Sequence, residues 1–465
     1  MKNHLTDQDS EKFSVLKTLL LLWIVVLAWA CQASAQDNRP PRKPNIVMIL
    51  ADDLGYGDLS SYGAPDLQTP NIDALVREGI RLDRFYANCP VCSPTRAALL
   101  TGRYPDLAGV PGVIRSNTRN SWGFLSQEAV LLPELLSKAG YQTALIGKWH
   151  LGLQSPNTPN ERGFDFFHGF LGDMMDDYYT HLRHGTNYMR RDTTVITPEG
   201  HATDVFSDWA VNYLESRATA PEPFFLYLAY NAPHTPIQPP EDWVERFRTR
   251  YPNVPERRAR LAALIEHMDS GIGRVIAALK ATRLDRNTLI VFTSDNGGQL
   301  DVGANCGPLR GGKQDMFEGG IRVPACAVWP GVIPPATRSD AVALTMDLYP
   351  TLCAAAGVSV PGPVEGVSLL PLFLNPNTVL PERTLFWMRR EGFGRYLGQD
   401  YLAVRRGSWK LMQNHPFEPF RLYDLSEDPQ EEHDLSSTER GVVNQMTALL
   451  QEHLQQSATV PWQQP

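Results

Sequence analysis

Reactive residue types are concentrated in one short segment, Cys92-Ser93-Pro94-Thr95-Arg96, followed by Ala97-Ala98-Leu99-Leu100-Thr101-Gly102-Arg103. The thiol precedes a proline suited to the first turn of a helix, and the arginine follows about one turn later. The run 96–100 favours a helix that Gly102 can end, so Cys92 is expected at or just before the helix N-terminus. Unpaired N–H groups there favour an anion, and the Arg96 guanidinium can bind two oxygens of a tetrahedral oxyanion. The alternative for Cys92 is a buried thiol or a disulfide with Cys89.

Four oxygen-donating side chains occur as two adjacent pairs, Asp52-Asp53 and Asp295-Asn296. Hard oxygen ligands select Ca²⁺ or Mg²⁺ over zinc. If the pairs come together, they can hold one divalent cation and leave a position open for an oxyanion. Either pair alone is also ordinary loop sequence. Their joint occurrence after predicted strands, in one chain with Cys92, favours the metal site.

Two lysines and two histidines complete the set of candidate catalytic residues: Lys148, His150, His234 and Lys313. Lys148 and His150 are two positions apart, so an extended backbone directs both to one side. A lone lysine or histidine is more often a surface charge or a satisfied structural group. Placed around a tetrahedral oxyanion, these cations would neutralise charge in the transition state. A histidine can also donate a proton near neutral pH.

The elements that must position these residues are strands that end beside them. Apolar runs predict buried strands at 44–50, 224–230 and 288–293, and a shorter strand at 141–146. Helices are predicted at 71–79 with Thr69 as the cap, 131–139 ended by Gly140, 202–217, 261–280 and 344–356. This alternation predicts an α/β doubly wound sheet. Because sites in such sheets lie at the carboxyl ends of the strands, the candidate residues can converge.

Two further regions have a distinct character. Residues 153–200 lack clear periodicity and are expected to form a lid or a substrate wall. Within this wall the candidates for substrate contacts, which are equally consistent with ordinary loop surface, are Asp176, Asp177, Tyr178, His181, His184 and Arg190. Strand-like segments at 384–388, 402–405, 409–413 and 421–424, with a helix at 441–455, predict a smaller α+β domain.

The N-terminal residues predict an exported protein, periplasmic or secreted. Lys12 and Lys17 precede an apolar run at 19–30, and the small residues at 33–35 fit a signal peptide cut after Ala35. A lipoprotein cysteine at Cys31 is the alternative, which Trp29 fits poorly. The predicted division is thus 1–35 signal peptide, 36–375 catalytic domain and 376–465 C-terminal domain.

The net charge bears on the class of binding partner, and the cysteine content bears on possible disulfides. The formal net charge of −8 argues against a nucleic acid, and no later apolar run is long enough to span a membrane. If Cys31 is removed with the signal peptide and Cys92 is the nucleophile, the cysteines that remain are Cys89, Cys306, Cys326 and Cys353. One or two disulfides among these four are possible.

The Cys92 segment resembles the signature of the type I sulfatases. Further motifs similar to that family are Ala51-Asp52-Asp53-Leu54-Gly55, Gly147-Lys148-Trp149-His150-Leu151-Gly152, Ala232-Pro233-His234, Ser294-Asp295-Asn296-Gly297, the stretch 313–322 and Leu422-Tyr423-Asp424-Leu425. The resemblance covers most of the mature chain. It implies an alkaline-phosphatase-like sandwich with a large mixed, mainly parallel sheet flanked by helices. A smaller C-terminal α+β domain with a four-stranded antiparallel sheet is implied as well.

The resemblance also implies a mechanism. A formylglycine-generating enzyme would oxidise Cys92 to formylglycine, whose hydrate attacks sulfur with one hydroxyl. Deprotonation of the second hydroxyl, by His150, would then expel sulfate and restore the aldehyde. His234 would assist departure of the alcohol. The resemblance further implies one Ca²⁺, held by Asp52, Asp53, Asp295, Asn296 and an oxygen of modified Cys92. Arg96 would steady the hydrate. Lys148 and Lys313 would bind sulfate oxygens.

The expected substrate is a sulfated carbohydrate or an aryl sulfate. The continuation at 102–105 and the surroundings of Lys313 are similar to N-acetylgalactosamine-6-sulfatases and arylsulfatases. One alternative is a phosphatase or phosphodiesterase of the alkaline phosphatase superfamily. Such enzymes usually carry serine or threonine as the nucleophile and a richer metal cluster. A second alternative is a non-catalytic glycan-binding relative.

Overall fold

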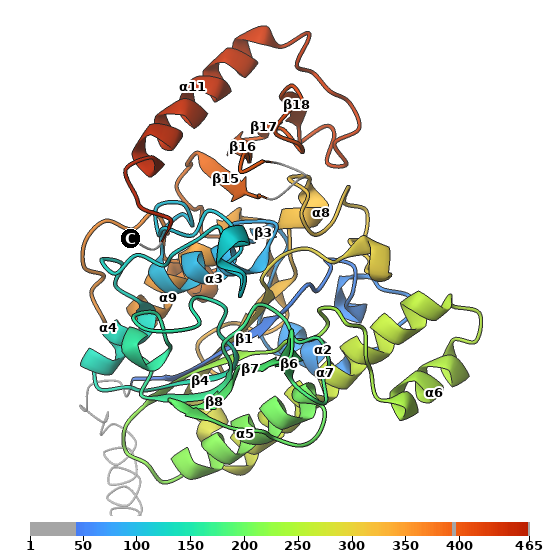
Figure 1. The fold of residues 1–465 in the computed structure, drawn as a ribbon, viewed down its shortest axis with the longest axis vertical. Coiled ribbons are helices and arrows are strands. Elements are labelled where there is room, and N and C mark those ends of the chain that lie inside the picture. Colours follow the sequence, from blue (N-terminus) through green and yellow to red (C-terminus); the bar gives the residue numbers. More distant parts are fainter. Residues whose placement is uncertain (1–42, 393–396, 464–465) are drawn as a thin grey trace, which may run out of the picture. The chain divides into compact units, whose positions relative to one another are not determined.

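A ten-stranded sheet is the largest element of the computed structural model, which describes residues 43–392 and 397–463 (Figure 1). The predicted signal peptide and Cys31 lie outside the described residues. The middle strands are parallel neighbours in the order β11 (Thr288–Ser294), β1 (Asn45–Ala51), β10 (Phe224–Ala229), β4 (Gln142–Lys148) and β5 (Phe166–Phe170). One edge continues through β12 (Ala325–Val328), β2 (Ile80–Leu82) and β13 (Thr337–Ser339), the other through β8 (Met189–Arg191) and β9 (Thr194–Val195). The predicted large mixed, mainly parallel sheet is confirmed.

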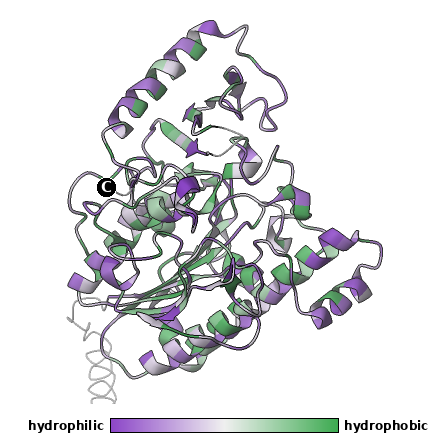
Figure 2. Ribbon diagram, in the orientation of Figure 1, coloured by the Kyte–Doolittle hydropathy of each residue, from purple (hydrophilic) through white to green (hydrophobic). Residues whose placement is uncertain are grey.

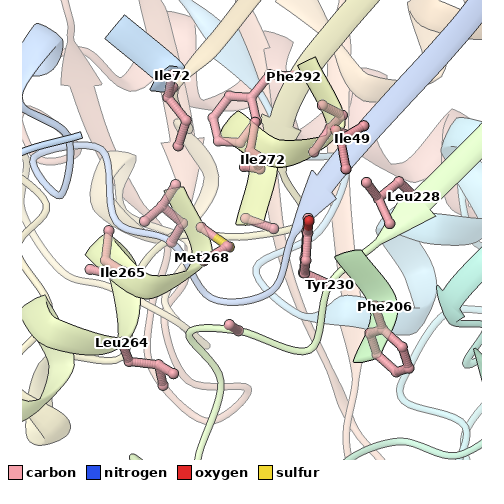
Figure 3. Packing of buried hydrophobic residues seen from close by; sticks show 14 of the residues in the cluster. Ile49, Ile72, Phe206, Leu228, Tyr230, Leu264, Ile265, Met268, Ile272 and Phe292 are labelled. Carbon is pink, nitrogen blue, oxygen red and sulfur yellow. The ribbon is translucent and has the colours of Figure 1, made fainter. Parts of the chain in front are cut away.

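Helices cover both faces of this sheet, and successive side chains of β1 enter opposite cores. Ile49 packs with Phe292 of β11 and with Ile272 of α7 (Glu256–Ala281) on one face (Figure 3). Met48 belongs to the core of the other face, together with Leu99 of α3 (Cys92–Thr101). A strand buried on both faces reads as one apolar run, which explains why these strands are visible in the sequence. The first face carries α2 (Pro70–Glu78), α5 (Ala202–Arg217) and α7 (Glu256–Ala281), the second α3 (Cys92–Thr101), α4 (Leu132–Lys138) and α9 (Leu348–Ala355).

Segment 153–200 is more ordered than its sequence predicts. Its first strand, β5, extends the main sheet beside β4, and β8 and β9 continue the same edge. A small hairpin, β6 (Leu182–Arg183) with β7 (Thr186–Asn187), stands apart from that sheet. These strands have two to five residues and no regular alternation, so periodicity did not reveal them.

A four-stranded antiparallel sheet forms the C-terminal part, as predicted. Its order is β15 (Leu385–Arg390), β16 (Asp400–Arg406), β17 (Trp409–Met412) and β18 (Arg421–Asp424). One face packs on α11 (Arg440–Ser457) through Met446 and Leu450. Figure 2 shows hydrophilic residues over much of α11, as expected for a helix with one buried stripe. The boundary at 375/376 stays a prediction.

Buried charges join this sheet to the catalytic part. Lys410 of β17, which has no solvent exposure, lies 3.0 Å from Glu318 and 2.8 Å from Glu431. Glu318 begins α8 (Glu318–Ile321), five residues after Lys313. The loop that carries Lys313 is therefore linked to the C-terminal sheet through the ion pair between Glu318 and Lys410. The remaining elements are β3 (Phe85–Tyr86), β14 (Ala343–Leu344), α6 (Glu241–Arg250) and α10 (Leu370–Leu374), with six 3₁₀ turns among the described residues.

The possible disulfides are not formed. Cys89, Cys92, Cys306, Cys326 and Cys353 are all buried free thiols. Cys89 and Cys92 therefore do not form the disulfide considered from their spacing. In the described part of the chain, no helix combines the length and apolar character needed to cross a membrane.

Candidate active site

The two acidic pairs meet at the carboxyl ends of neighbouring strands. Asp52 and Asp53 follow β1, and Asp295 and Asn296 follow β11. The Asp53 amide donates to Asp295 Oδ1 at 3.2 Å. Ser294 links the two loops, because its Oγ accepts from the Leu54 amide at 3.0 Å and donates to the Asn296 carbonyl at 2.9 Å. Residues 242 positions apart in the sequence thus share one end of the sheet.

Cys92 is the first residue of α3, and Gly102 ends this helix in a left-handed conformation, as predicted. Its Sγ lies in a group with Asp52, Asp53 and His234 in which the candidate ligand atoms are all within 4.8 Å of one another. The side chain is buried, and burial raises the pKa of the thiol to about 12. An unmodified Cys92 is therefore a neutral thiol here at neutral pH.

Strand β15 covers the segment that leads into Cys92. The Trp387 indole donates to the Ala87 carbonyl at 2.8 Å, and the Cys89 thiol donates to the Met388 carbonyl at 3.2 Å. The partners in each pair are about 300 positions apart in the sequence. The C-terminal sheet thus completes the wall around the start of α3.

Three cations pair with the three carboxylates of the site. The Lys148 ammonium donates to Asp52 at 2.5 Å, and the Lys313 ammonium donates to Asp53 at 2.6 Å. The Arg96 guanidinium donates from Nε and Nη2 to Asp295 Oδ2, at 3.0 and 2.7 Å. Burial alone would raise the pKa of Asp52, but the positive charges around it, chiefly those of Lys148 and Arg96, outweigh burial and lower that pKa. These charge-assisted bonds lie in a buried cup formed around Asp52, Asp53, Cys92 and His234.

Gly147 allows Lys148 to reach this cup. It has φ +105° at the end of β4, and a Cβ there would lie 1.9 Å from the Ala229 carbonyl of β10. Asp53, His150 and Gln314 also adopt left-handed backbone conformations. Such conformations cost energy in residues with side chains and cluster at functional sites.

His234 is a neutral acceptor in this arrangement. Its Nδ1 donates to the Thr235 carbonyl at 2.7 Å, so Nε2 accepts from the Lys313 ammonium at 2.9 Å. Burial lowers the pKa of His234, the Asp53 carboxylate opposes this, and Lys313 lowers it further. The ring is therefore harder to protonate than an ordinary histidine, and added negative charge would favour its protonation.

His150 is neutral for a similar reason. Its Nε2 donates to the Ile114 carbonyl at 2.8 Å, which leaves Nδ1 as a buried acceptor without a hydrogen-bond partner. Burial lowers the pKa of His150 well below its ordinary value, and the charges of Lys148 and Arg96 act in the same direction. His150 is thus a neutral ring with an open acceptor at Nδ1, and its surroundings disfavour the protonated form.

The donor set fits a hard divalent cation. Asp52 Oδ1 and Asn296 Oδ1 are buried and have no hydrogen-bond partner. Unsatisfied buried oxygens are costly unless an ion or water completes them. A possible metal site therefore lies beside Cys92.

A second group, formed by His201, Asp204 and His267, fits a hydrogen-bond network better than a metal site. His201 Nδ1 accepts from the Thr203 amide at the start of α5, and its Nε2 donates to the Gln238 carbonyl. His267 bonds to Asp204 at 3.0 Å, and Arg274 pairs with the same carboxylate. Of the four ring nitrogens of these two histidines, three are thus hydrogen-bonded and His267 Nδ1 has no partner, while the Arg274 cation lies beside the carboxylate.

Tyr178 is the member of the predicted substrate wall that reaches the site. Its buried hydroxyl lies 2.7 Å from the Asn231 carbonyl and 2.8 Å from the His234 carbonyl. Asp176 instead pairs with Arg183 in the same segment, and Asp177 accepts from Gln238. The sequence marks Tyr178 as a candidate for substrate contact, but it does not indicate that Tyr178 holds two backbone carbonyls or that the Ile114 carbonyl holds His150, because such contacts leave no sequence signal.

The comparisons with known proteins identify the class. The family model described as Sulfatase matches residues 44–358. A second model, described as N-sulphoglucosamine sulphohydrolase, C-terminal, matches residues 312–459. The chain belongs to the sulfatase family and is thus a sulfuric ester hydrolase.

Individual relatives agree with this class. N-acetylgalactosamine-6-sulfatase of Homo sapiens is 32% identical over 91% of this chain and 87% of its own length. Arylsulfatase A of Bos taurus is 34% identical over 89% of this chain and 86% of its own length. Among solved structures, that of Ps i-CgsB in complex with k-i-k-neocarrahexaose matches with a TM-score of 0.82 and 32% identity, over 91% of this chain and 95% of that one.

Proposed function

We propose that this enzyme hydrolyses sulfate esters of a glycan, with formylglycine made from Cys92 as the nucleophile and one Ca²⁺ bound beside it. The observation that carries the proposal is the buried cup in which Cys92 lies with Asp52, Asp53 and His234. Three cations, Arg96, Lys148 and Lys313, pair with the carboxylates of the same cup. A phosphatase would be expected to show serine or threonine in the position of Cys92.

Each candidate catalytic residue has a separate role in the proposed reaction. Lys148 and Lys313 bind sulfate oxygens, and Arg96 holds Asp295 and steadies the nucleophile. His234 protonates the departing alcohol, since the negative charge of a bound sulfate ester would raise the pKa of its ring. His150 accepts a proton at Nδ1 when sulfate is released.

A modification of Cys92 and a bound cation complete the proposal. Formylglycine supplies an aldehyde hydrate with one hydroxyl for attack on sulfur and a second for release of sulfate. Asp52, Asp53, Asp295 and Asn296, with an oxygen of modified Cys92, would hold Ca²⁺. When bound, the cation supplies a Lewis-acidic centre for an ester oxygen and offsets the carboxylate charges.

The names of the relatives support a sulfated carbohydrate as the substrate. Two of them are named for N-acetylgalactosamine 6-sulfate and for aryl sulfates, and the Ps i-CgsB structure contains an oligosaccharide. Export, with cleavage after Ala35, and maturation by a formylglycine-generating enzyme belong to the same proposal. N-terminal sequencing of the exported protein tests the cleavage site.

The decisive experiment combines mass and turnover. The tryptic peptide that contains Cys92 should be about 18 Da lighter than the unmodified peptide, because CHO replaces CH₂SH. The protein should release sulfate from an aryl sulfate at least about 100-fold faster than phosphate from the matching aryl phosphate, and Cys92→Ala should abolish this release. A Cys92→Ala protein that still releases sulfate, or a preference for the phosphate ester, would refute the proposal.

A further inference from the structure

A cavity of about 530 Å³ shares a wall with the cup. Ile114 lines this cavity, while its amide donates to Ser93 Oγ at 3.1 Å and its carbonyl accepts from His150 at 2.8 Å. Leu151, the residue after His150, lines it as well. The cavity is therefore separated from the start of α3 by a single backbone segment, and its volume is typical of ligand pockets.

The lining has the composition of a saccharide site. It offers hydroxyl and amide groups from Ser116, Thr118 and Gln154, and ring surfaces from Phe124 and Trp462. Among the described residues that line the cavity, Arg115 is the one with a full charge, and none is a carboxylate. A neutral sugar ring can use the hydroxyl and ring contacts, but the single cation selects for negative charge.

The charge of Arg115 is only partly neutralised. Its guanidinium lies 3.0 Å from Glu391, which also pairs with Arg389 at 2.7 Å. One carboxylate between two guanidinium groups leaves a net charge of +1. Arg115 donates from Nη1 and Nη2 to Glu391 and the Asn120 carbonyl, which engages at most three of its five N–H groups. Its side chain is 24% exposed, so it can bind a ligand.

Part of the lining comes from the C-terminal tail beyond α11, through Trp462 and Gln463. The Trp462 ring stacks on Trp122 with centroids 5.4 Å apart, and the Arg390 guanidinium lies 4.6 Å from the Trp462 centroid. Trp122 is fixed in turn by a bond from its indole to Asn120 at 3.0 Å. The tail is thus held in place as one side of the cavity.

We propose that this cavity is a subsite for the saccharide next to the one that loses sulfate, and that Arg115 selects a neighbour with an anionic group, a sulfate ester or a carboxylate. The proposal rests on the proposed function, because it assigns the rest of the glycan that the cup would hold. A charge-assisted bond from the planar guanidinium supplies the selectivity. Trp462 closes the subsite and limits the position of the sugar ring.

The test compares sulfated disaccharides with a matched variant pair. N-acetylgalactosamine 6-sulfate would be offered alone and joined to a uronate, to a second sulfated sugar or to a neutral sugar. We expect Arg115→Gln to lower the ratio of kcat/KM between the anionic and neutral neighbours by about 10-fold, and Arg115→Lys to lower it less. Arg119→Gln, in the same loop but exposed and outside the lining, is the control and should leave this ratio within about twofold. A thermal unfolding scan identifies any variant that fails to fold.

The outcomes separate the two proposals. Absence of sulfate release from every substrate by the formylglycine-bearing protein contradicts the proposed function. Normal release with no preference for an anionic neighbour, or a preference unchanged in folded Arg115→Gln and Arg115→Lys, overturns the subsite alone. The uronate and sulfate arms show which anion Arg115 accepts. Trp462→Ala should lower kcat/KM for all disaccharides relative to the monosaccharide, and an unchanged value would remove the tail from the subsite.

Discussion

Arg96 donates two hydrogen bonds to the same carboxylate oxygen of Asp295, although the residues are 199 positions apart. Neither side chain has any solvent exposure. These bonds join the second turn of α3 to the residue that follows β11, and so fix Cys92 relative to the acidic pairs. A buried pair of this kind is costly to break from one side, because the remaining charge has no solvent.

Arg96→Ala should therefore lower the free energy of unfolding by about 3–5 kcal/mol, measured by urea denaturation. Arg96→Lys keeps the charge but loses the fork, and should reduce sulfate release at least about 100-fold with a smaller loss of stability. Arg84→Lys, in an exposed pair with Asp340, is the control and should cost less than about 0.5 kcal/mol. Equal effects at positions 84 and 96 would contradict the role given to Arg96.

Calcium should stabilise the folded protein through the oxygens of Asp52 and Asn296 that have no partner. At a concentration 100 times its Kd, a ligand that binds only the folded state adds about 2.7 kcal/mol. We expect a chelator to lower the thermal midpoint and excess Ca²⁺ to restore it. Asp53→Asn should remove most of this response, whereas Asp340→Asn, at an exposed residue, should retain it. A thermal midpoint that changes with neither chelator nor Ca²⁺ would argue against a metal ion at these oxygens.

Tyr178 should position His234 rather than bind substrate. Tyr178→Phe removes the hydroxyl that contacts the Asn231 and His234 carbonyls, and should lower kcat about 10-fold with little change in KM. If His234 protonates the leaving group, a sugar sulfate should lose more rate than a nitrophenyl sulfate, whose phenolate leaves without a proton. Tyr179→Phe, at a neighbour with 48% exposure, is the matched control. Equal losses on both substrates would indicate a merely structural role.

Lys410→Met should destabilise the protein by about 3–5 kcal/mol near pH 7.5, because Glu318 and Glu431 lose the cation they share. Burial raises the pKa of Glu431, and removal of Lys410 would raise it further. Protonation of the carboxylates should make the loss smaller at pH 5.5 than at pH 7.5. Arg246→Ala, which breaks an exposed pair with Asp242, should cost less than about 0.5 kcal/mol at either pH. A loss that grows on acidification would contradict this explanation.

His201 should make the fold sensitive to acid. Burial lowers the pKa of His201 to about 4, and the neighbouring His267 acts in the same direction, while Asp204 opposes both. Between about pH 6.5 and pH 4 the unfolded chain binds a proton that the folded chain does not, so stability falls as the pH falls, by up to about 3 kcal/mol.

His201→Asn keeps a cap for α5 and removes this titration. The free energy of unfolding of the variant should fall less between pH 7.5 and pH 5 than that of the unchanged protein. His184→Asn, at a side chain with 66% exposure, should leave the slope unchanged. Parallel pH profiles for His201→Asn and the unchanged protein would refute this assignment.

Sequence patterns predicted the parts of this fold that depend on continuous burial. β1, β10 and β11 are apolar on both faces, so they stand out, and their carboxyl ends bring Asp52, Asp295 and His234 together. β5 escaped prediction because Gly169 and His168 break its apolar run. Gly169 is required there, since a Cβ would lie 1.9 Å from the Gly147 carbonyl.

Contacts made by backbone carbonyls, or by the C-terminal end of the chain, could not be predicted from the sequence either. Nothing in the residue types shows that Ile114 holds His150 or that Trp462 returns to Trp122. Both contacts depend on loop paths, which hydrophobic periodicity does not encode.

The cover that Trp387 and Met388 place over the segment before Cys92 has a consequence for biosynthesis. These residues leave the ribosome about 300 positions after the segment they cover. At about 5–20 residues per second, the thiol has on the order of 15–60 s before its covering strand exists. If the proposed formylglycine-generating enzyme acts on the growing chain, it has that interval to reach Cys92, and slowing translation of the final third should then increase the fraction of chains that carry formylglycine.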